Sequence, residues 1–259
     1  DLFFRWTELG AFSPIMRTHH GTKPTLNVNA FTSEQTLSHW SRYARLHTRL
    51  YPYLRALAHT ATSKGGAPLW VPLPLRFPGD DVWAVKDEVM LGPALLVAPV
   101  VTAHAVHRHV RFPSARFAPF PFSFDAAGAS PPAVVDGPAD VDVLAPQDVI
   151  PVYVVAGGIV PMLADDVDTL VPAPPGSGLK GLEATEGDRV VVVALGADGS
   201  FTEESGASYT LTGDGSTKPA STEPDGAVVV TGDATIKGDG FTFTLAHQPA
   251  TRTTRVLFE

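Results

Sequence analysis

The feature that most constrains this chain is an abrupt change of sequence pattern near residue 65. Before it, apolar residues recur every three or four positions, as on one face of a helix. After it, short apolar runs alternate with Gly, Pro and Asp-Gly, which is typical of strands joined by turns. The charge changes at the same place: residues 1–64 carry 8 Lys or Arg and 3 Asp or Glu, whereas residues 65–259 carry 11 and 24. Such a shift predicts a domain boundary.

Two helices are expected before this boundary. The first covers residues 2–9, and the second starts at Thr32, which has capping-box spacing to Gln35. Pro52 should kink the second helix about one turn earlier, and Gly65-Gly66 should end it. A short apolar stretch between two helices cannot close a domain. The aromatic residues of this part therefore either pack on the β-regions or belong to a domain whose N-terminal portion is missing, and we favour the second.

The pattern in the rest of the chain predicts β-strands. A first group is expected at residues 69–77, 89–101 and 149–163, and a linker with three Asp follows at residues 165–168. A second group has the spacing of a β-sandwich, at residues 190–195, 208–212, 227–231, 241–245 and 255–258.

Composition excludes several classes of function. The chain of 259 residues has no Cys, so disulfides, Cys-based zinc sites and thiolate nucleophiles are ruled out. A net charge of −8 argues against nucleic-acid and anionic-membrane partners. No run of 18 apolar residues is present, and the first residues lack the pattern of a signal peptide. The compartment stays open, although a chain without Cys suits the cytoplasm.

The other chemistry-bearing motifs have simpler interpretations. The three His at positions 104, 107 and 109 are read as a solvated strand face rather than a metal site. The acidic pairs at 80–81 and 87–88 are read as a turn and an exposed edge. A nucleophile elbow and a phosphate-binding glycine loop are both absent from the sequence. We therefore expect neither a metal nor a cofactor.

The second helix carries a row of basic side chains. They form either a solvated face, which is the usual case, or a contact with an acidic neighbouring segment, as the charge asymmetry suggests. They are Arg42, Arg45, Arg49 and Arg55.

Several segments, in order, resemble glycoside hydrolase family 31. DLFFRWTELGAFSPIMRTHHG (1–21) is similar to the end of the family's catalytic barrel, with its Arg-Trp, Gly-Ala-Phe, Pro and Arg-x-His. Residues 49–81 resemble the last barrel helix and the Pro-rich strand that follows. DEVMLGPALLVAPVV (87–101) and IPVYVVAGGIVPM (150–162) resemble segments of the proximal β-sandwich. The resemblance covers residues 1–163 well and the remainder faintly.

The resemblance implies a fold of the α/β plus all-β class. It consists of the last strand–helix segments of a (β/α)8 TIM barrel in residues 1–65, a proximal β-sandwich in 66–165 and a distal β-sandwich in 166–259. Ser13 to Arg17 would be the eighth barrel strand. Active sites of such barrels lie where strands give way to loops.

The resemblance also implies a role. His19, the His of Arg-x-His, would hydrogen-bond hydroxyls of the sugar at the cleavage point, and Arg17 would support the pocket wall, whereas the adjacent His20 matches no role. A retaining glycosidase needs two carboxylates, which the family carries as aspartates on earlier barrel strands. No residue here matches them, so the chain alone should be inactive. Its expected partners are the missing N-terminal barrel portion, on the same or a separate polypeptide, and an α-linked sugar.

Other functions stay open. In a second hypothesis, the chain is a non-catalytic β-sandwich module that binds either protein or carbohydrate, the latter through Trp83 and Tyr209. In a third hypothesis, it is a complete hydrolase. Within the family, glucosidases, xylosidases, galactosidases and sulfoquinovosidases resemble one another in this region. MRTHHG followed by NVNA is most similar to bacterial members that include sulfoquinovosidases.

Overall fold

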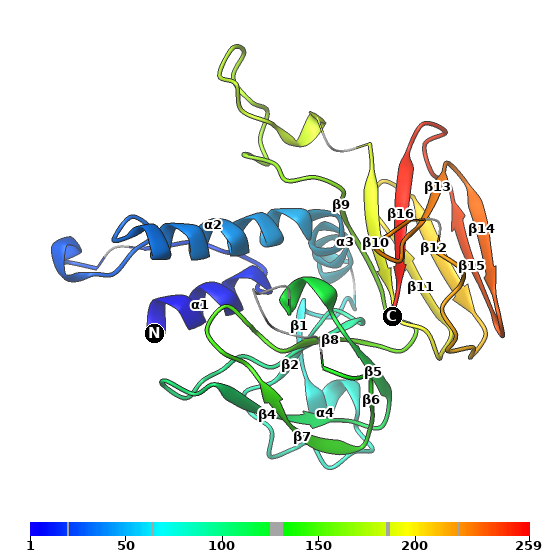
Figure 1. The fold of residues 1–259 in the computed structure, drawn as a ribbon, viewed down its shortest axis with the longest axis horizontal. Helices are drawn as coiled ribbons and strands as arrows, with labels where there is room; N and C mark the ends of the chain where they lie inside the picture. The colour runs from blue at the N-terminus through cyan, green and yellow to red at the C-terminus, as the bar shows by residue number, and fades with distance from the viewer. Residues whose placement is uncertain (20, 64, 125–131, 185–186, 222) are drawn as a thin grey trace.

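The computed structural model describes residues 1–19, 21–63, 65–124, 132–184, 187–221 and 223–259; His20 lies outside them. Helices α1 and α2 lie above the first region of β-sheet, α3 stands next to this region and to a second one, and the C-terminal strands stand furthest from α1 (Figure 1). Among the described residues, no helix has the length and apolar character needed to cross a bilayer.

The helices begin and end near the predicted positions. Helix α1 covers Leu2–Ala11, α2 covers Glu34–Arg49 and α3 covers Tyr51–Thr62. The capping box lies one residue later than predicted: the Ser33 side chain accepts from the Thr36 N–H, and the Thr36 hydroxyl oxygen accepts from the Ser33 N–H. The predicted kink is a break at Leu50, because Pro52 sits in the first turn of α3, where its missing N–H costs no helical hydrogen bond.

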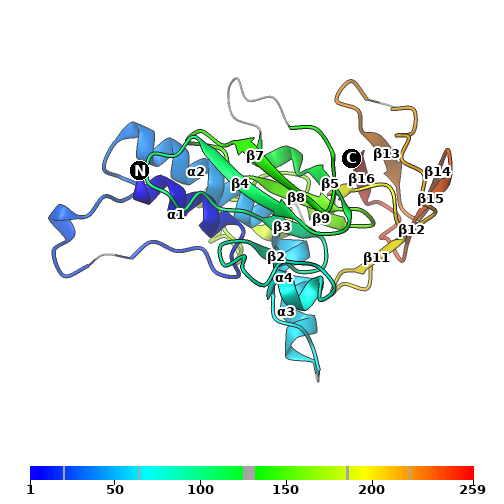
Figure 2. The same cartoon turned by 90° about the horizontal axis from the view of Figure 1, so that it is seen from below.

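The strand expected at Ser13 to Arg17 is wrong, because these residues form bends and extended chain (Figure 2). A strand requires a neighbour that accepts and donates its backbone hydrogen bonds. The local bonds turn the chain instead: the Ser13 N–H donates to the Gly10 carbonyl, and the Ser13 hydroxyl lies 2.8 Å from the carbonyl oxygens of both Gly10 and Ile15. A 3-10 turn at Pro24–Leu26 follows before α2.

The first β-region is a six-stranded sheet covered by a two-stranded ribbon. All neighbouring strands of the sheet are antiparallel, in the order β1-β2-β3-β8-β5-β6. The short helix α4 (Leu73–Arg76) replaces the end of the strand predicted for 69–77, where Pro72 and Pro74 remove two ladder donors. A core that includes Phe112, Phe117 and Tyr153 lies between sheet and ribbon. The strands are β1 (Trp70–Pro72), β2 (Val89–Leu91), β3 (Leu95–Val97), β5 (Arg116–Pro119), β6 (Val135–Asp136) and β8 (Val152–Val155), with β4 (His107–Phe112) and β7 (Ala139–Leu144) as the ribbon.

The second β-region consists of two four-stranded sheets, β13-β16-β10-β9 and β11-β12-β15-β14. Alternation along β15 points Phe241, Phe243 and Leu245 into the core. Because β9 pairs with β10, this sheet starts at Ile159, ahead of the predicted linker. The strands are β9 (Ile159–Leu163), β10 (Arg189–Val193), β11 (Gly199–Thr202), β12 (Ser208–Thr212), β13 (Val228–Thr231), β14 (Ala234–Gly238), β15 (Phe241–Ala246) and β16 (Thr253–Phe258).

One hydrophobic core joins the helices to both β-regions. Leu50 and Tyr53 pack in the same cluster as Val154 of β8 and Val192 of β10. The ring of Tyr53 stacks on Phe201 of β11 at 5.1 Å between centroids. The helices therefore fill the space between the two β-regions.

Candidate functional site

A pocket of about 790 Å³ lies along α1 and the chain that follows it. Its volume is within the range of small-molecule sites. Most of its lining is apolar, including Trp6, Trp40 and Trp70, while Arg17 and His19 supply polar groups. The structure thus brings the two sequence-predicted residues to one pocket, where both are exposed.

The apolar wall of this pocket is unusually open to solvent. Trp6 is 64% exposed and Ile15 is 75% exposed, and Leu2 beside them is also exposed. Contiguous exposed apolar residues mark a surface that contacts another molecule or segment. Of the aromatic residues before the predicted boundary, Trp6 lies on this exposed surface, whereas Phe12 is fully buried.

The chain that carries Arg17 and His19 is fixed where it leaves α1. The Trp70 Nε1–H donates to the Phe12 carbonyl at 2.8 Å. The His47 Nδ1 lies 3.1 Å from the Ala11 carbonyl oxygen, which can only accept, so this nitrogen carries the proton. Burial lowers the pKa of His47, which favours the neutral ring.

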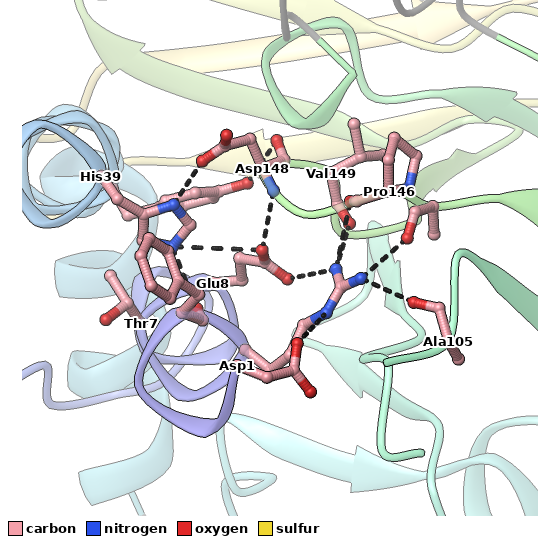
Figure 3. Close-up of polar contacts among 12 residues, drawn as sticks. Asp1, Thr7, Glu8, His39, Ala105, Pro146, Asp148 and Val149 are labelled. Carbon is pink, nitrogen blue, oxygen red and sulfur yellow. Dashed lines mark hydrogen bonds and ion pairs between the residues drawn. The ribbon is translucent and has the colours of Figure 1, made fainter. Parts of the chain in front are cut away.

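A buried polar network lies between α1 and the loops of the first β-region (Figure 3). Arg5 donates to the Glu8 carboxylate at 2.9 Å and to the carbonyl oxygens of Ala105 and Ala145, each at 2.9 Å. The other Glu8 oxygen accepts from the Asp148 N–H at 3.0 Å, and the Asp148 carboxylate contacts His39 Nδ1. The network therefore joins α1 and α2 to the loops of the first β-region.

Burial sets the protonation of this network. It raises the pKa of Glu8 to about 7, against the lowering effect of Arg5 and of the Asp148 N–H. Burial also lowers the pKa of His39, although the hydrogen bond of His39 to the Asp148 carboxylate acts in the opposite direction. A carboxyl group with a pKa near 7 is suited to acid–base catalysis. Glu8 is only 1% exposed, however, and both of its oxygens are hydrogen-bonded, so its role is structural.

Sequence reasoning missed this network. Arg5 has the spacing of helical ion pairs to Glu8 at i, i+3 and to Asp1 at i, i+4, and these are local signals. The backbone groups of Ala105 and Asp148 that complete the network lie 100 or more residues away along the chain.

Two of the acidic motifs differ in environment. The Asp80 carboxylate accepts from the Ser114 N–H at 2.7 Å and from its hydroxyl at 2.6 Å, which agrees with a turn. The expected exposed edge is wrong for Glu88, which is 4% exposed and accepts from the Arg111 N–H at 3.0 Å. Burial raises the pKa of Glu88 to about 7.

The histidine cluster lies partly on β4, as predicted. His109 contacts two carboxylates of β7: its Nδ1 is 2.9 Å from Asp142, and its Nε2 is 3.5 Å from Asp140. The hydrogen bond that His109 donates to the Asp142 carboxylate raises the pKa of His109. Throughout the described ranges, no three His, Asp or Glu side chains are placed to hold a metal ion.

The basic row on α2 and α3 is solvated only in part, and the alternative of a contact with acidic side chains of another segment is confirmed for Arg45 and Arg55, which stay 61% and 51% exposed. Arg42 and Arg49 donate to the carbonyl oxygens of Asp148 and Leu163 at 3.0 and 3.2 Å. Arg45 pairs with Asp166 at 3.7 Å, and Arg55 pairs with Glu204.

The two aromatics of the carbohydrate-binding alternative are placed differently. Trp83 is 71% exposed on the first β-region. Tyr209 is fully buried and donates to the Glu203 carboxylate at 2.5 Å, so it cannot stack on a sugar.

The helical segment with its pocket, followed by two regions of β-sheet, defines the end of a catalytic barrel attached to β-sandwich domains. Residues 1–57 match the model of the glycosyl hydrolases family 31 TIM-barrel domain, and residues 66–160 match that of the family 31 C-terminal domain. The chain belongs to glycoside hydrolase family 31, as its resemblance predicted, and the predicted fold class is confirmed.

Curated relatives match part of the chain. Sulfoquinovosidase of Agrobacterium fabrum is 38% identical over 114 residues, which cover 44% of this chain and 17% of that protein. Lysosomal alpha-glucosidase of Bos taurus is 34% identical over 170 residues, which cover 62% of this chain and 18% of that protein. The chain thus spans less than a fifth of the length of these relatives.

Solved structures share the fold across nearly the whole chain. A family 31 alpha-xylosidase from Xanthomonas citri covers 98% of this chain with a TM-score of 0.63 at 22% identity, over 25% of its own length. The cycloalternan-forming enzyme from Listeria monocytogenes covers 97% with a TM-score of 0.67 at 17% identity, over 27% of its length.

Proposed function

We propose that this chain is the C-terminal part of a retaining α-glycosidase that hydrolyses α-linked sugars. The observation that carries the proposal is the ordered match of two family 31 models, to residues 1–57 and 66–160. Such an enzyme acts through two carboxylates about 5–5.5 Å apart. We place both on barrel sequence other than these 259 residues, because no residue here matches the family's aspartates.

His19 and Arg17 are the residues that we assign to the sugar. Both are exposed and line the pocket of about 790 Å³. An imidazole can donate to or accept from a hydroxyl, and a guanidinium donates from a planar fork, so this pair suits a polyhydroxylated ring.

The partner that we assign to the open apolar surface is the preceding part of the barrel, on the same or a separate polypeptide. A barrel buries the inward faces of its outer helices. Leu2, Trp6 and Ile15 lie on the surface that such a barrel would cover. In this proposal residues 1–65 complete the barrel, and the sandwich units expected at 66–165 and 166–259 buttress it, with β9 joined to the second unit rather than the first.

The substrate class follows from the relatives, which include sulfoquinovosidases and alpha-glucosidases. An assay panel should therefore contain 4-nitrophenyl α-glucoside, α-xyloside and α-sulfoquinovoside. Each is to be tested on the 259-residue chain alone and on the chain assembled with the polypeptide that completes the barrel. We expect turnover only in the assembled form; turnover by the chain alone would contradict the placement of the carboxylates.

The role of His19 is tested in the assembled enzyme with His19→Ala. Loss of a hydrogen bond to a sugar hydroxyl should lower kcat/KM about 10- to 100-fold. His107→Ala, which alters an exposed His on β4, is the matched control and should leave kcat/KM unchanged. Equal activity of His19→Ala and the control would refute the assignment.

A further inference from the structure

The segment 13–19, which carries Arg17 and His19, begins just after α1. Side chains from two different parts of the chain hydrogen-bond to the two residues before it. His47 of α2 donates to the Ala11 carbonyl at 3.1 Å, and Trp70 of β1 donates to the Phe12 carbonyl at 2.8 Å. Ala11 and Phe12 are fully buried. Carbonyls at a helix C-terminus lack partners in a following turn, so side chains must satisfy them.

Beyond these two bonds, local contacts shape the segment. The Ser13 hydroxyl lies 2.8 Å from the carbonyl oxygens of Gly10 and Ile15. Met16 packs against the core and lies over Gly10, where an added Cβ would come within 3.4 Å of the Met16 side chain. His47 and Trp70 are the contacts that reach the start of the segment from distant parts of the chain, so they fix the direction in which the chain leaves Phe12 toward Arg17 and His19.

We propose that His47 and Trp70 are positioning residues, which hold Arg17 and His19 in place for sugar binding. The proposal rests on the function assigned above. His47 does not line the pocket of Arg17 and His19, so its effect must pass through the segment 13–19. Trp70 belongs to the six-stranded sheet, so that sheet fixes part of the pocket directly.

The attachment is measured first in the 259-residue chain, by amide hydrogen exchange of the peptide that spans residues 10–16. His47→Leu and Trp70→Phe each remove one donor to a buried carbonyl, so we expect about five- to tenfold faster exchange. His47→Asn, which keeps a donor near the Nδ1 position, should restore the wild-type rate. Unchanged exchange in both donor-deleting variants would overturn the proposal.

A matched control separates this effect from general loosening of the same interface. Tyr53→Phe removes two buried hydrogen bonds between a helix and the six-stranded sheet, one donated to the Leu91 carbonyl at 2.8 Å and one accepted from the Ala94 N–H at 3.2 Å. It should leave the exchange of residues 10–16 unchanged. Exchange of β12, in the second β-region, reports whether each variant is folded. An equal response of residues 10–16 to Tyr53→Phe would overturn the proposal.

The positioning role is then tested by a double-mutant cycle in the assembled enzyme. His47→Leu should lower kcat/KM about tenfold when His19 is present and by a clearly smaller factor in the His19→Ala background, where only Arg17 remains to be positioned. Equal losses in both backgrounds would show a merely structural role and refute positioning. If the assembled wild type hydrolyses no α-glycoside, the proposed function fails, whereas the exchange experiment still decides whether His47 and Trp70 hold the segment.

Discussion

The buried carboxyl group of Glu8 makes a sharp prediction about pH. Glu8 is 1% exposed and bonded to Arg5 and to the Asp148 N–H, and burial raises its pKa from 4.5 to about 7. A group whose pKa is higher in the folded than in the unfolded state favours folding when it is protonated. The contribution of Glu8 is therefore fully present below pH 4.5 and is lost as the pH rises through 7.

The magnitude follows from the shift. One pKa unit corresponds to about 1.4 kcal/mol, so the rise of Glu8 from 4.5 to about 7 amounts to about 3 kcal/mol. Most of this change falls between pH 5 and pH 8. His39 acts in the opposite direction, because its pKa is lowered and stability is lost when the pH falls through its range. Wild-type stability alone therefore does not isolate Glu8.

The assay is urea unfolding of wild type and Glu8→Gln at several values between pH 5 and pH 8, followed by tryptophan fluorescence and circular dichroism. The free energy of unfolding of wild type minus that of Glu8→Gln should fall by about 2–3 kcal/mol across this range. Glu34→Gln, at an exposed position in the first turn of α2, controls for the substitution. A difference that is flat, or that rises with pH, would refute the reasoning and show that Arg5 keeps Glu8 ionised.

Three further substitutions test the packing. Glu203→Gln removes the buried counterion that Arg189 contacts at 2.9 Å, and should lower the free energy of unfolding by about 3–5 kcal/mol in urea titrations. Phe243→Ala opens a cavity between the sheets of the second β-region and should cost about 3–5 kcal/mol, seen as a lower Tm. Trp83→Ala, at a 71% exposed position, should change the free energy of unfolding by less than about 0.5 kcal/mol. If the chain alone binds a sugar and Trp83→Ala abolishes that binding, the result would support the non-catalytic alternative instead.

Most of the strands in the second β-region could be predicted from alternation and turns. The strand at 208–212 matches β12, and that at 241–245 is one residue shorter than β15. Two strands were missed, Gly199–Thr202 and Ala234–Gly238, because each has a single large apolar residue. Their partners across the sheet, rather than their own composition, hold them in register.

The site was only partly predictable. Arg17 and His19 came from a family resemblance, whereas the contacts that hold their segment came from His47 and Trp70, which no motif singles out. A His on a helix and a Trp on a strand have many uses, and only the fold shows which carbonyl each reaches. The same limit applies to Asp148, whose backbone and side chain meet both α1 and α2.

The distribution of apolar residues bears on the choice between an enzyme part and a non-catalytic module. If the helices served only to fill the space between the β-regions, their apolar residues would gather on the buried side, as Tyr43, Leu50 and Tyr53 do. Trp6 and Ile15 instead line the open pocket with Arg17 and His19. The buried side of α1 carries Arg5, Thr7 and Glu8, whereas its apolar residues Leu2 and Trp6 are exposed, so this apolar side requires a partner. The barrel explains the exposed apolar side, and it accounts for the neighbouring polar pair as well, so we favour the glycosidase assignment.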